Sequence, residues 1–409
     1  MRLLLINHYA GSLRHGMEYR PYYLAREWVR LGHDVCIVAA AASHVRSHAP
    51  ELGGRSRLDE RIDDIGYCWY ATPPYRGNGL GRVRNMAAFV GQLYGDARRL
   101  ARWGPDVVIA SSTYPLDIFP ARRIATLAGA RLLFEVHDLW PLSPIELGGH
   151  SRWHPFMALL QAAENYACRH ADAVVSILPK VGEHLQAHGM AAHKLHIVPN
   201  GADPDEWVAG AGPALAPALA RQLAALHAQG RAVVGYAGAH GLANALDTVL
   251  GAAQLTQDLA VDYVLVGAGP DKARLQQRAQ ALGLANVLFV DGIGKAQVPA
   301  LLRCFDLAYI GWQRQPLYRF GIAPNKLIDY MMAGLPVVHA VEAGNDPVAE
   351  AGCGLTVAPE DPGAVARAVR TLLALPAPAR AAMGARGRAY ALGHLSYPVL
   401  GRQFLHACV

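Results

Sequence analysis

Short apolar runs alternate along this chain with segments in which apolar residues recur every three or four positions. Apolar runs of about four to eight residues are typical of buried strands, whereas the wider spacing predicts helices. Regular alternation of strand and helix predicts a parallel sheet with helices on both faces. The first series of predicted strands covers residues 3–7, 34–40, 66–71, 106–110, 131–136, 173–177 and 195–198.

The alternation restarts after an Ala-, Pro- and Gly-rich stretch at residues 209–220. Two such series predict an α/β chain of two Rossmann-like domains whose parallel sheets face a central cleft. We expect domains at residues 1–200 and 201–385, followed by a helical segment at 386–409 that packs back on the first domain. The predicted strands of the second series are 232–238, 262–269, 287–292, 307–312 and 335–340.

Glycine-rich loops follow the strands of the second half. The loop of GYAGAHGLAN (235–244) contains Gly238 and Gly241 between a predicted strand and a helix. Glycines at such a place let backbone N–H groups approach a phosphate closely. The spacing matches neither the dinucleotide fingerprint nor the Walker A motif, so the pattern favours a sugar nucleotide. The second loop, VGAGPDK (266–272), is interpreted as a tight turn.

The stretch FGIAPNKLIDYMMAG (320–334) predicts a helix that begins near Pro324 and ends at Gly334. Lys326 lies in its first turn, where the helix dipole disfavours a cation. The lysine is understandable if an anion binds at that helix start, held by backbone N–H groups and by the ammonium together.

Composition limits the class of protein. The chain has 409 residues, of which 52% are hydrophobic and 17% charged, enough for full-sized cores. Its six cysteines form no C-x-x-C pair, which indicates neither a disulfide framework nor a metal site. No signal peptide or apolar run of membrane-spanning length is present. We expect a soluble, cytoplasmic chain.

Basic residues concentrate between residues 72 and 103, within a predicted long amphipathic helix. Two interpretations remain open: a solvated basic face, or contact with anionic lipid headgroups or a phosphate-bearing substrate. Nucleic acid is not expected, because no nucleic-acid motif accompanies the patch. The arginines are Arg76, Arg82, Arg84, Arg98, Arg99 and Arg102, against one acidic residue, Asp96.

Four segments together resemble retaining glycosyltransferases of the GT-B fold, in the large glycogen-synthase-like group: FGIAPNKLIDYMMAGLPVV, GYAGAHG, HDLWPLSPIELGG and VPNGAD. Two further segments, HGMEYRPYYLAREWVRLGHDV and GNDPVAEAGCGL, are similar to fucosaminyltransferases of bacterial O-antigen clusters. The resemblance covers almost the whole chain in matching order. It implies that the first domain binds the acceptor and the second binds a UDP-sugar donor.

The resemblance also implies roles for residues at matching positions. Lys326 and the helix start at Asn325 would bind the donor diphosphate, and Asp329 would bind the ribose hydroxyls. Gly16 would let the donor phosphates approach the first domain, and His137 would contact the donor sugar as a catalytic residue. Gly238 and Gly241 complete the donor loop.

The chain departs from the family at several positions. Gly321 stands where many relatives carry the first motif glutamate, and the Arg and Lys that usually follow the glycine loop are missing. Arg319 or His240 could replace these donor contacts. Glu350 either faces the donor or caps a local turn.

Two other patterns have the spacing of metal ligands. Asp203 and Asp205 are interpreted as a cap and turn. His184 and His188 are interpreted as a surface pair, because the sequence indicates no third ligand. We therefore expect no bound metal and no cofactor.

The resemblance implies transfer of a sugar from UDP to a polyprenyl-diphosphate-linked glycan in O-antigen or capsule synthesis, with the anomeric configuration retained. N-acetyl-L-fucosamine or a related amino sugar is the donor sugar that the narrower likeness suggests. The protein would work on the inner face of the membrane, which Arg76, Arg82 and Arg84 would contact. A UDP-sugar 2-epimerase of the same fold and a non-catalytic adaptor remain alternatives.

Overall fold

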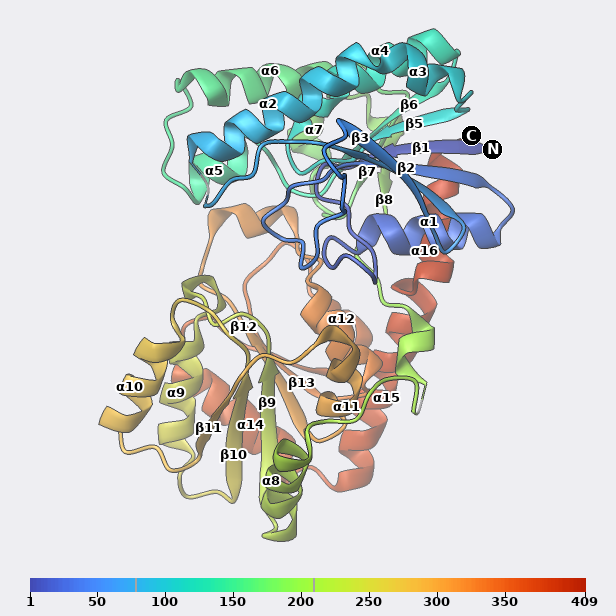
Figure 1. Ribbon diagram of the computed structural model, residues 1–409. Coiled ribbons are helices and arrows are strands. Elements are labelled where there is room, and N and C mark those ends of the chain that lie inside the picture. Colours follow the sequence, from blue (N-terminus) through green and yellow to red (C-terminus); the bar gives the residue numbers. More distant parts are fainter. Residues whose placement is uncertain (78, 209) are drawn as a thin grey trace. The chain divides into compact units, whose positions relative to one another are not determined.

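The computed structural model describes residues 1–77, 79–208 and 210–409, which form two compact units (Figure 1). The first unit comprises Met1–Asn200 together with Tyr397–Val409, and the second comprises Gly201–Ser396. Within the described residues, each unit is built on one sheet covered by helices on both faces. This arrangement confirms the predicted α/β class with two Rossmann-like domains.

The sheet of the first unit has the strand order β3-β4-β2-β1-β5-β6-β7-β8. Neighbouring strands are parallel, except that β3 and β4 form an antiparallel hairpin. The strands are β1 (Arg2–Ile6), β2 (Asp34–Ala40), β3 (Arg57–Ile62), β4 (Ile65–Tyr70), β5 (Val107–Ala110), β6 (Arg131–Val136), β7 (Ala173–Ser176) and β8 (Leu195–Ile197).

Helix α1 (Arg20–Arg30) and helix α16 (Tyr397–Ala407) cover one face of this sheet. Tyr23 stacks on Tyr397, and Trp28 donates a hydrogen bond to the Gly401 carbonyl at 3.0 Å. Residues 397–409 therefore complete the core of the first unit. The other helices of this unit are α2 (Leu80–Gly95), α3 (Ala97–Arg102), α4 (Ile118–Ala128), α5 (Leu142–Glu146), α6 (Pro155–His170) and α7 (Gly182–Ala187).

The single long basic helix predicted from the sequence is wrong, because the chain breaks into α2 and α3 at Asp96. The Asp96 carboxylate accepts hydrogen bonds from Arg99 at 2.6 Å and from Tyr70 at 2.6 Å. These bonds hold the Asp96 pKa below its usual range despite the opposing effect of burial. Arg99 is thus a structural residue and not a solvated one.

The sheet of the second unit has the order β11-β10-β9-β12-β13-β14, and all its pairs are parallel. The order reverses between β9 and β12, which is the switch point where open α/β sheets bind ligands. The strands are β9 (Ala232–Ala237), β10 (Val261–Val266), β11 (Val287–Val290), β12 (Leu307–Gly311), β13 (Val337–Ala340) and β14 (Gly354–Thr356).

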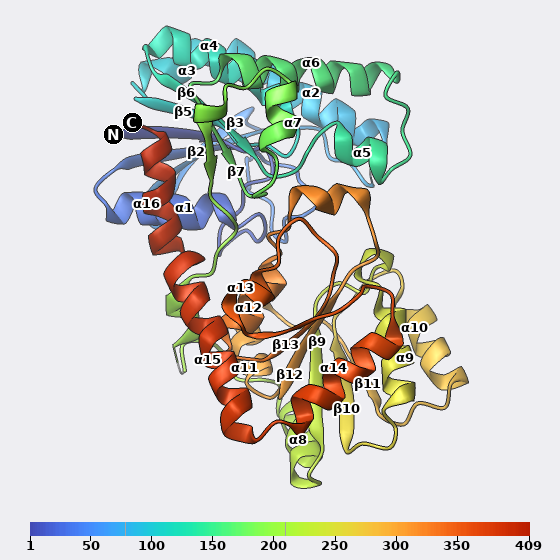
Figure 2. The ribbon, with the colours of Figure 1, turned by 180° about the vertical axis from the view of Figure 1, so that it is seen from behind.

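Helices pack on both faces of the second sheet, as Figure 2 shows from behind. One face carries α9 (Leu246–Leu255), α10 (Lys272–Ala281) and α14 (Pro362–Ala374). The opposite face carries α8 (Pro217–Ala228), α11 (Val298–Leu302), α12 (Asn325–Met332), α13 (Pro347–Ala351) and α15 (Ala377–His394). Among the described residues, no helix is long and apolar enough to span a lipid bilayer.

Candidate functional site

A cavity of about 230 Å³ lies at the carboxyl ends of β9, β10 and β11 in the second unit. Glycine residues from three successive strand–helix loops form much of its wall, so backbone groups are accessible there. Helix α12 closes one side. The lining residues include Gly238, Gly267, Gly292, Lys326, Asp329 and Tyr330.

Close packing explains why the loops after β9 and β10 carry glycine at residues 238 and 267. A Cβ on Gly238 would lie 2.7 Å from Cε of Lys326, so only glycine lets the lysine side chain pass. A Cβ on Gly267 would overlap the Gly238 carbonyl oxygen. The VGAGPDK loop was predicted to be a tight turn only, yet Gly267 and Ala268 also line the cavity. Gly241 has open space around it and does not line the cavity.

Lys326 occupies the first turn of α12, half-buried beside the glycine loop. Its Nζ donates to Tyr236 Oη at 2.8 Å and to Asn244 Oδ1 at 2.9 Å. Among the described residues, no carboxylate pairs with Lys326, whose only other contact of this kind is with the Tyr236 ring, 4.2 Å from Nζ to the ring centre. The first N–H groups of α12 also lack intrahelical acceptors. This corner of the cavity is therefore short of negative charge.

Burial lowers the pKa of Lys326 to about 7. The physical cause is the removal of the ammonium from water without a compensating anion nearby. A bound polyanion would supply that compensation, and so would favour the charged form of the side chain.

Asp329 lies one turn further along α12 and lines the same cavity. Burial raises its pKa to about 7, and the Lys295 charge opposes this rise. Among the described residues, its carboxylate accepts no hydrogen bond, so it is available to a ligand hydroxyl. Helix α12 thus places an ammonium group and a carboxyl group, which can accept a hydrogen bond from a ligand hydroxyl, in the same cavity.

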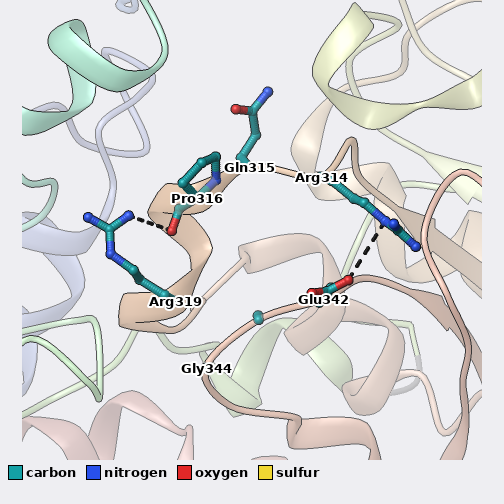
Figure 3. Close-up of a pocket in the computed structure, with 7 residues that line it drawn as sticks. Arg314, Gln315, Pro316, Arg319, Glu342 and Gly344 are labelled. Carbon is teal, nitrogen blue, oxygen red and sulfur yellow. Dashed lines mark hydrogen bonds and ion pairs between the residues drawn. The ribbon is translucent and has the colours of Figure 1, made fainter.

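A second cavity, of about 550 Å³, lies at the loops after β12 and β13 (Figure 3). Arg314 and Arg319 lie on opposite sides of it. The Arg314 Nε atom is 3.7 Å from Glu342, and Arg319 donates to the Pro316 carbonyl at 2.6 Å. Gly321, which replaces the family glutamate, has a φ of 94°, a conformation that glycine adopts without strain.

In the first unit, His137 follows β6 and contacts a buried polar network. Its Nε2 lies 3.2 Å from Glu135 Oε2 and 2.9 Å from Ser111 Oγ. The hydroxyl of Ser111 donates to the same Glu135 oxygen at 2.6 Å. Nε2 of His137 is therefore held by Glu135 and Ser111, which fixes the orientation of the ring.

Arg20 completes this network from α1. Its Nε donates to Glu135 Oε1 at 2.9 Å, and its Nη2 donates to the Val198 carbonyl at 2.8 Å. Burial opposes ionisation of Glu135, but the charges of His137 and Arg20 outweigh it and lower the Glu135 pKa to about 2. The orientation of His137 is therefore fixed by a carboxylate that is ionised at neutral pH.

The remaining predicted site residues lie away from these cavities or have structural partners. Gly16 has a φ of 96°, and Ser47 occupies the space that its Cβ would take. Glu350 is exposed on α13 and accepts a hydrogen bond from Tyr390 at 2.8 Å, whereas Asp346 caps that helix. His240 is fully buried, with a pKa lowered first by burial, and does not line the cavity beside Lys326.

Asp203 and Arg82, two residues singled out in the sequence, lie outside the lining of both cavities. Asp203 caps the short helix at Pro204–Trp207 and accepts from the Asp205 N–H at 3.3 Å, which confirms the cap-and-turn interpretation. Arg82, one of the three arginines predicted to contact the membrane, lies in the first turn of α2. Its Nε donates to Tyr9 Oη at 3.0 Å, and its guanidinium stacks on Trp140.

Two family models match the chain in succession. The first, a glycosyl transferase 4-like domain, covers residues 15–201, and the second, glycosyl transferases group 1, covers residues 230–375. The chain belongs to the GT-B glycosyltransferases. The chain is therefore classed as a glycosyltransferase (EC 2.4).

Individual relatives of this glycosyltransferase are distant in sequence. It is 25% identical over 361 residues to WcaI of Escherichia coli K12, a glycosyl transferase assigned to colanic acid biosynthesis, covering 86% of this chain and 87% of WcaI. Anabaena HepE in complex with UDP-glucose superposes with a TM-score of 0.68 at 17% identity, covering 99% and 98% of the two chains. WaaG, a glycosyltransferase of lipopolysaccharide biosynthesis, gives 0.67 at 17%, covering 100% of both.

Sequence reasoning missed several residues of this glycosyltransferase that the structure places around the candidate site. Tyr236 and Asn244 hold the Lys326 ammonium, although both lie in the quoted glycine loop. Glu135 and Arg20 support His137. A charged residue inside the apolar strand at 131–136 was the available signal for Glu135, because an ionised carboxylate is seldom buried without a partner.

Proposed function

We propose that this glycosyltransferase moves a sugar from a UDP-sugar to a polyprenyl-diphosphate-linked glycan, with retention of the anomeric configuration. An amino sugar such as N-acetyl-L-fucosamine is the proposed donor sugar, and a surface polysaccharide of the O-antigen or capsule type is the proposed product. The reaction uses no metal and no cofactor.

The observation that carries this proposal is the Lys326 corner of the donor cavity. An ammonium without a carboxylate partner, the start of α12 and a glycine loop converge there, which is the chemistry that binds a diphosphate. Asp329, free to accept hydrogen bonds in the same cavity, suits the hydroxyls of a ribose. The complex of HepE with UDP-glucose supports a nucleotide-sugar donor for this fold.

In the proposed reaction, the bond between the anomeric carbon and the β-phosphate oxygen breaks as the acceptor hydroxyl attacks from the same face. The acceptor proton passes to the departing phosphate. Lys326 and the α12 dipole stabilise the charge that develops on that phosphate. His137, oriented by Glu135, positions the sugar. Arg319 and the loop beside it would replace the missing family contacts to the sugar.

The pH dependence of UDP binding tests the role of Lys326. A lysine with a pKa of about 7 must take up a proton to bind UDP at higher pH, so affinity should fall up to about tenfold per unit between pH 7 and 9. Asp329 also has a pKa of about 7, so its own titration would overlap with that of Lys326. UDP binding is therefore best measured by calorimetry in the Asp329→Asn variant, which lacks this carboxyl group. In that variant, the additional change Lys326→Met should weaken UDP binding and remove the dependence of the affinity on pH. A flat profile with Lys326 present would contradict the assignment.

Two experiments separate the proposal from the other functions of the fold. A non-catalytic adaptor would show no rise in melting temperature with UDP, whereas the transferase is expected to show one. An epimerase would convert UDP-N-acetylglucosamine alone into its 2-epimer, and the transferase would not. A panel of UDP-sugars, with release of UDP as the readout, would then identify the donor.

We also propose that the first unit contacts an anionic membrane surface. Helices α2 and α6 begin at the same end of this unit (Figures 1 and 2). Apolar and basic side chains near these two helix starts are exposed. Leu80 is 87% exposed and Trp153 is 79% exposed. Arg76 and Arg84 are exposed near Leu80, whereas Arg82 is held by Tyr9 and Trp140.

Sedimentation with vesicles tests this surface. Each arginine near an anionic surface contributes about 1 kcal/mol, so Arg76→Gln with Arg84→Gln should lower binding to phosphatidylglycerol vesicles by about 30-fold at low salt. Exposed arginines on α3 provide the matched control, Arg98→Gln with Arg102→Gln. Equal losses in both double variants would indicate nonspecific attraction, and no binding of the wild type would contradict the proposal.

A further inference from the structure

We propose that Glu164, His184 and His188 form a binding site for one zinc ion, which joins α6 to α7. The sequence indicated only a histidine pair with four-residue spacing. The fold supplies the third ligand, because α6 and α7 are neighbours in the first unit (Figure 2) and Glu164 on α6 contacts His184 on α7. One ligand atom from each of the three side chains lies within 4.8 Å of the others.

The distances fit a shared metal. Ligand atoms held tetrahedrally by zinc, at about 2.0–2.1 Å from the ion, lie about 3.3 Å from each other. His184 Nε2 is 3.1 Å from Glu164 Oε1, which already meets this separation. His188 Nε2 is 4.0 Å from Glu164 Oε2 and requires a small side-chain rotation. His188 is the residue that directly follows the last turn of α7.

Burial and charge favour a cation at this place. The side chain of Glu164 is only 3% exposed, yet among the described residues no Lys or Arg pairs with it. Its partners are the two histidines and the Gln161 amide, which donates to Oε2 at 2.7 Å. A buried carboxylate without a strong cationic partner is costly, and a divalent ion removes that cost.

The surroundings also suit metal-bound histidine. The Gln161 amide lies 3.1 Å from Nδ1 of His188. Because Nδ1 of His188 faces this amide, its other ring nitrogen, Nε2, is the one that lies toward Glu164. The side chains of His184 and His188 are 12% and 25% exposed, which leaves a path for the ion and room for water as the fourth ligand.

The test is calorimetric titration of the full chain, purified without a histidine tag and stripped of metal, with zinc chloride. One zinc per chain is expected to bind. His184→Ala and His188→Ala should each weaken binding by more than about 100-fold, beyond the loss caused by an outer-shell change. The nearby exposed histidine provides the control, His193→Ala, which should bind like the wild type.

Two further measurements keep the outcome clear. Zinc should raise the melting temperature of the wild type and of His193→Ala, but not of His184→Ala. Cobalt bound in place of zinc should give the absorption of a tetrahedral site in the wild type, and this absorption should be lost in His188→Ala. Absence of stoichiometric binding, or equal binding by all three variants through cysteines, would overturn the proposal.

Discussion

Replacing Lys326 by methionine is expected to lower kcat/KM for sugar transfer by roughly 30- to 1,000-fold. This range corresponds to a loss of about 2–4 kcal/mol of transition-state stabilisation, as is typical when one group that stabilises developing charge is removed. The physical reason is that no other cation of the described cavity lining would offset the charge on the departing diphosphate. Steady-state kinetics with the identified UDP-sugar measures the effect.

Folding provides the internal control for this prediction. Methionine keeps the apolar stem of the lysine and removes an ammonium whose burial is unfavourable, as its lowered pKa shows. The melting temperature without ligand should therefore stay close to that of the wild type, while stabilisation by UDP should fall. The exposed lysine of the first unit gives a matched variant, Lys180→Met, with normal kinetics. Near-normal turnover of Lys326→Met would remove the lysine from the mechanism.

Replacing Glu135 by leucine is expected to destabilise the first unit by about 3–5 kcal/mol. Arg20 would then be left buried without its carboxylate, and an uncompensated buried charge costs about that much. Because two-unit chains seldom unfold in one step, hydrogen exchange of the β6 amides is the suitable measurement. Arg20→Met combined with Glu135→Leu should recover part of the loss, and simple additivity would contradict the coupling.

The same carboxylate predicts an acid dependence. The Glu135 pKa is lowered from 4.5 to about 2, so its contribution to stability is fully present above about pH 4.5. That contribution should be lost as the pH falls from 4.5 through 2. In Glu135→Gln this part of the acid sensitivity should disappear, because the amide does not titrate.

Most strands of the fold could be predicted from the sequence, because most of them are short apolar runs. The predicted runs 34–40 and 131–136 coincide with β2 and β6, since each has both faces buried. Strand β3 was missed because its sequence, RLDERI, is charged and lies at the edge of the sheet in an antiparallel pair. The break between α2 and α3 was missed because it depends on Asp96 meeting Tyr70, far away in sequence.

The sequence predicted those site residues whose own position indicates their chemistry. It did not predict contacts between residues that only the fold brings together. Lys326 could be found from its position in a helix start, because a cation there conflicts with the dipole. Its partner Asn244 could not, since its place at the end of the glycine loop matches no known motif. Likewise, the carboxylate beside His184 comes from a helix 20 residues earlier, so only the fold brings the zinc ligands together.

The chain path has a consequence for the order of events during synthesis. Tyr397, Leu400 and Phe404 pack into the core of the first unit but are translated after the whole of the second unit. While the second unit is being synthesised, the nascent first unit therefore still exposes the apolar side of α1, including Trp28. Until residues 397–409 emerge, that uncovered surface is the part of the chain most in need of protection by chaperones.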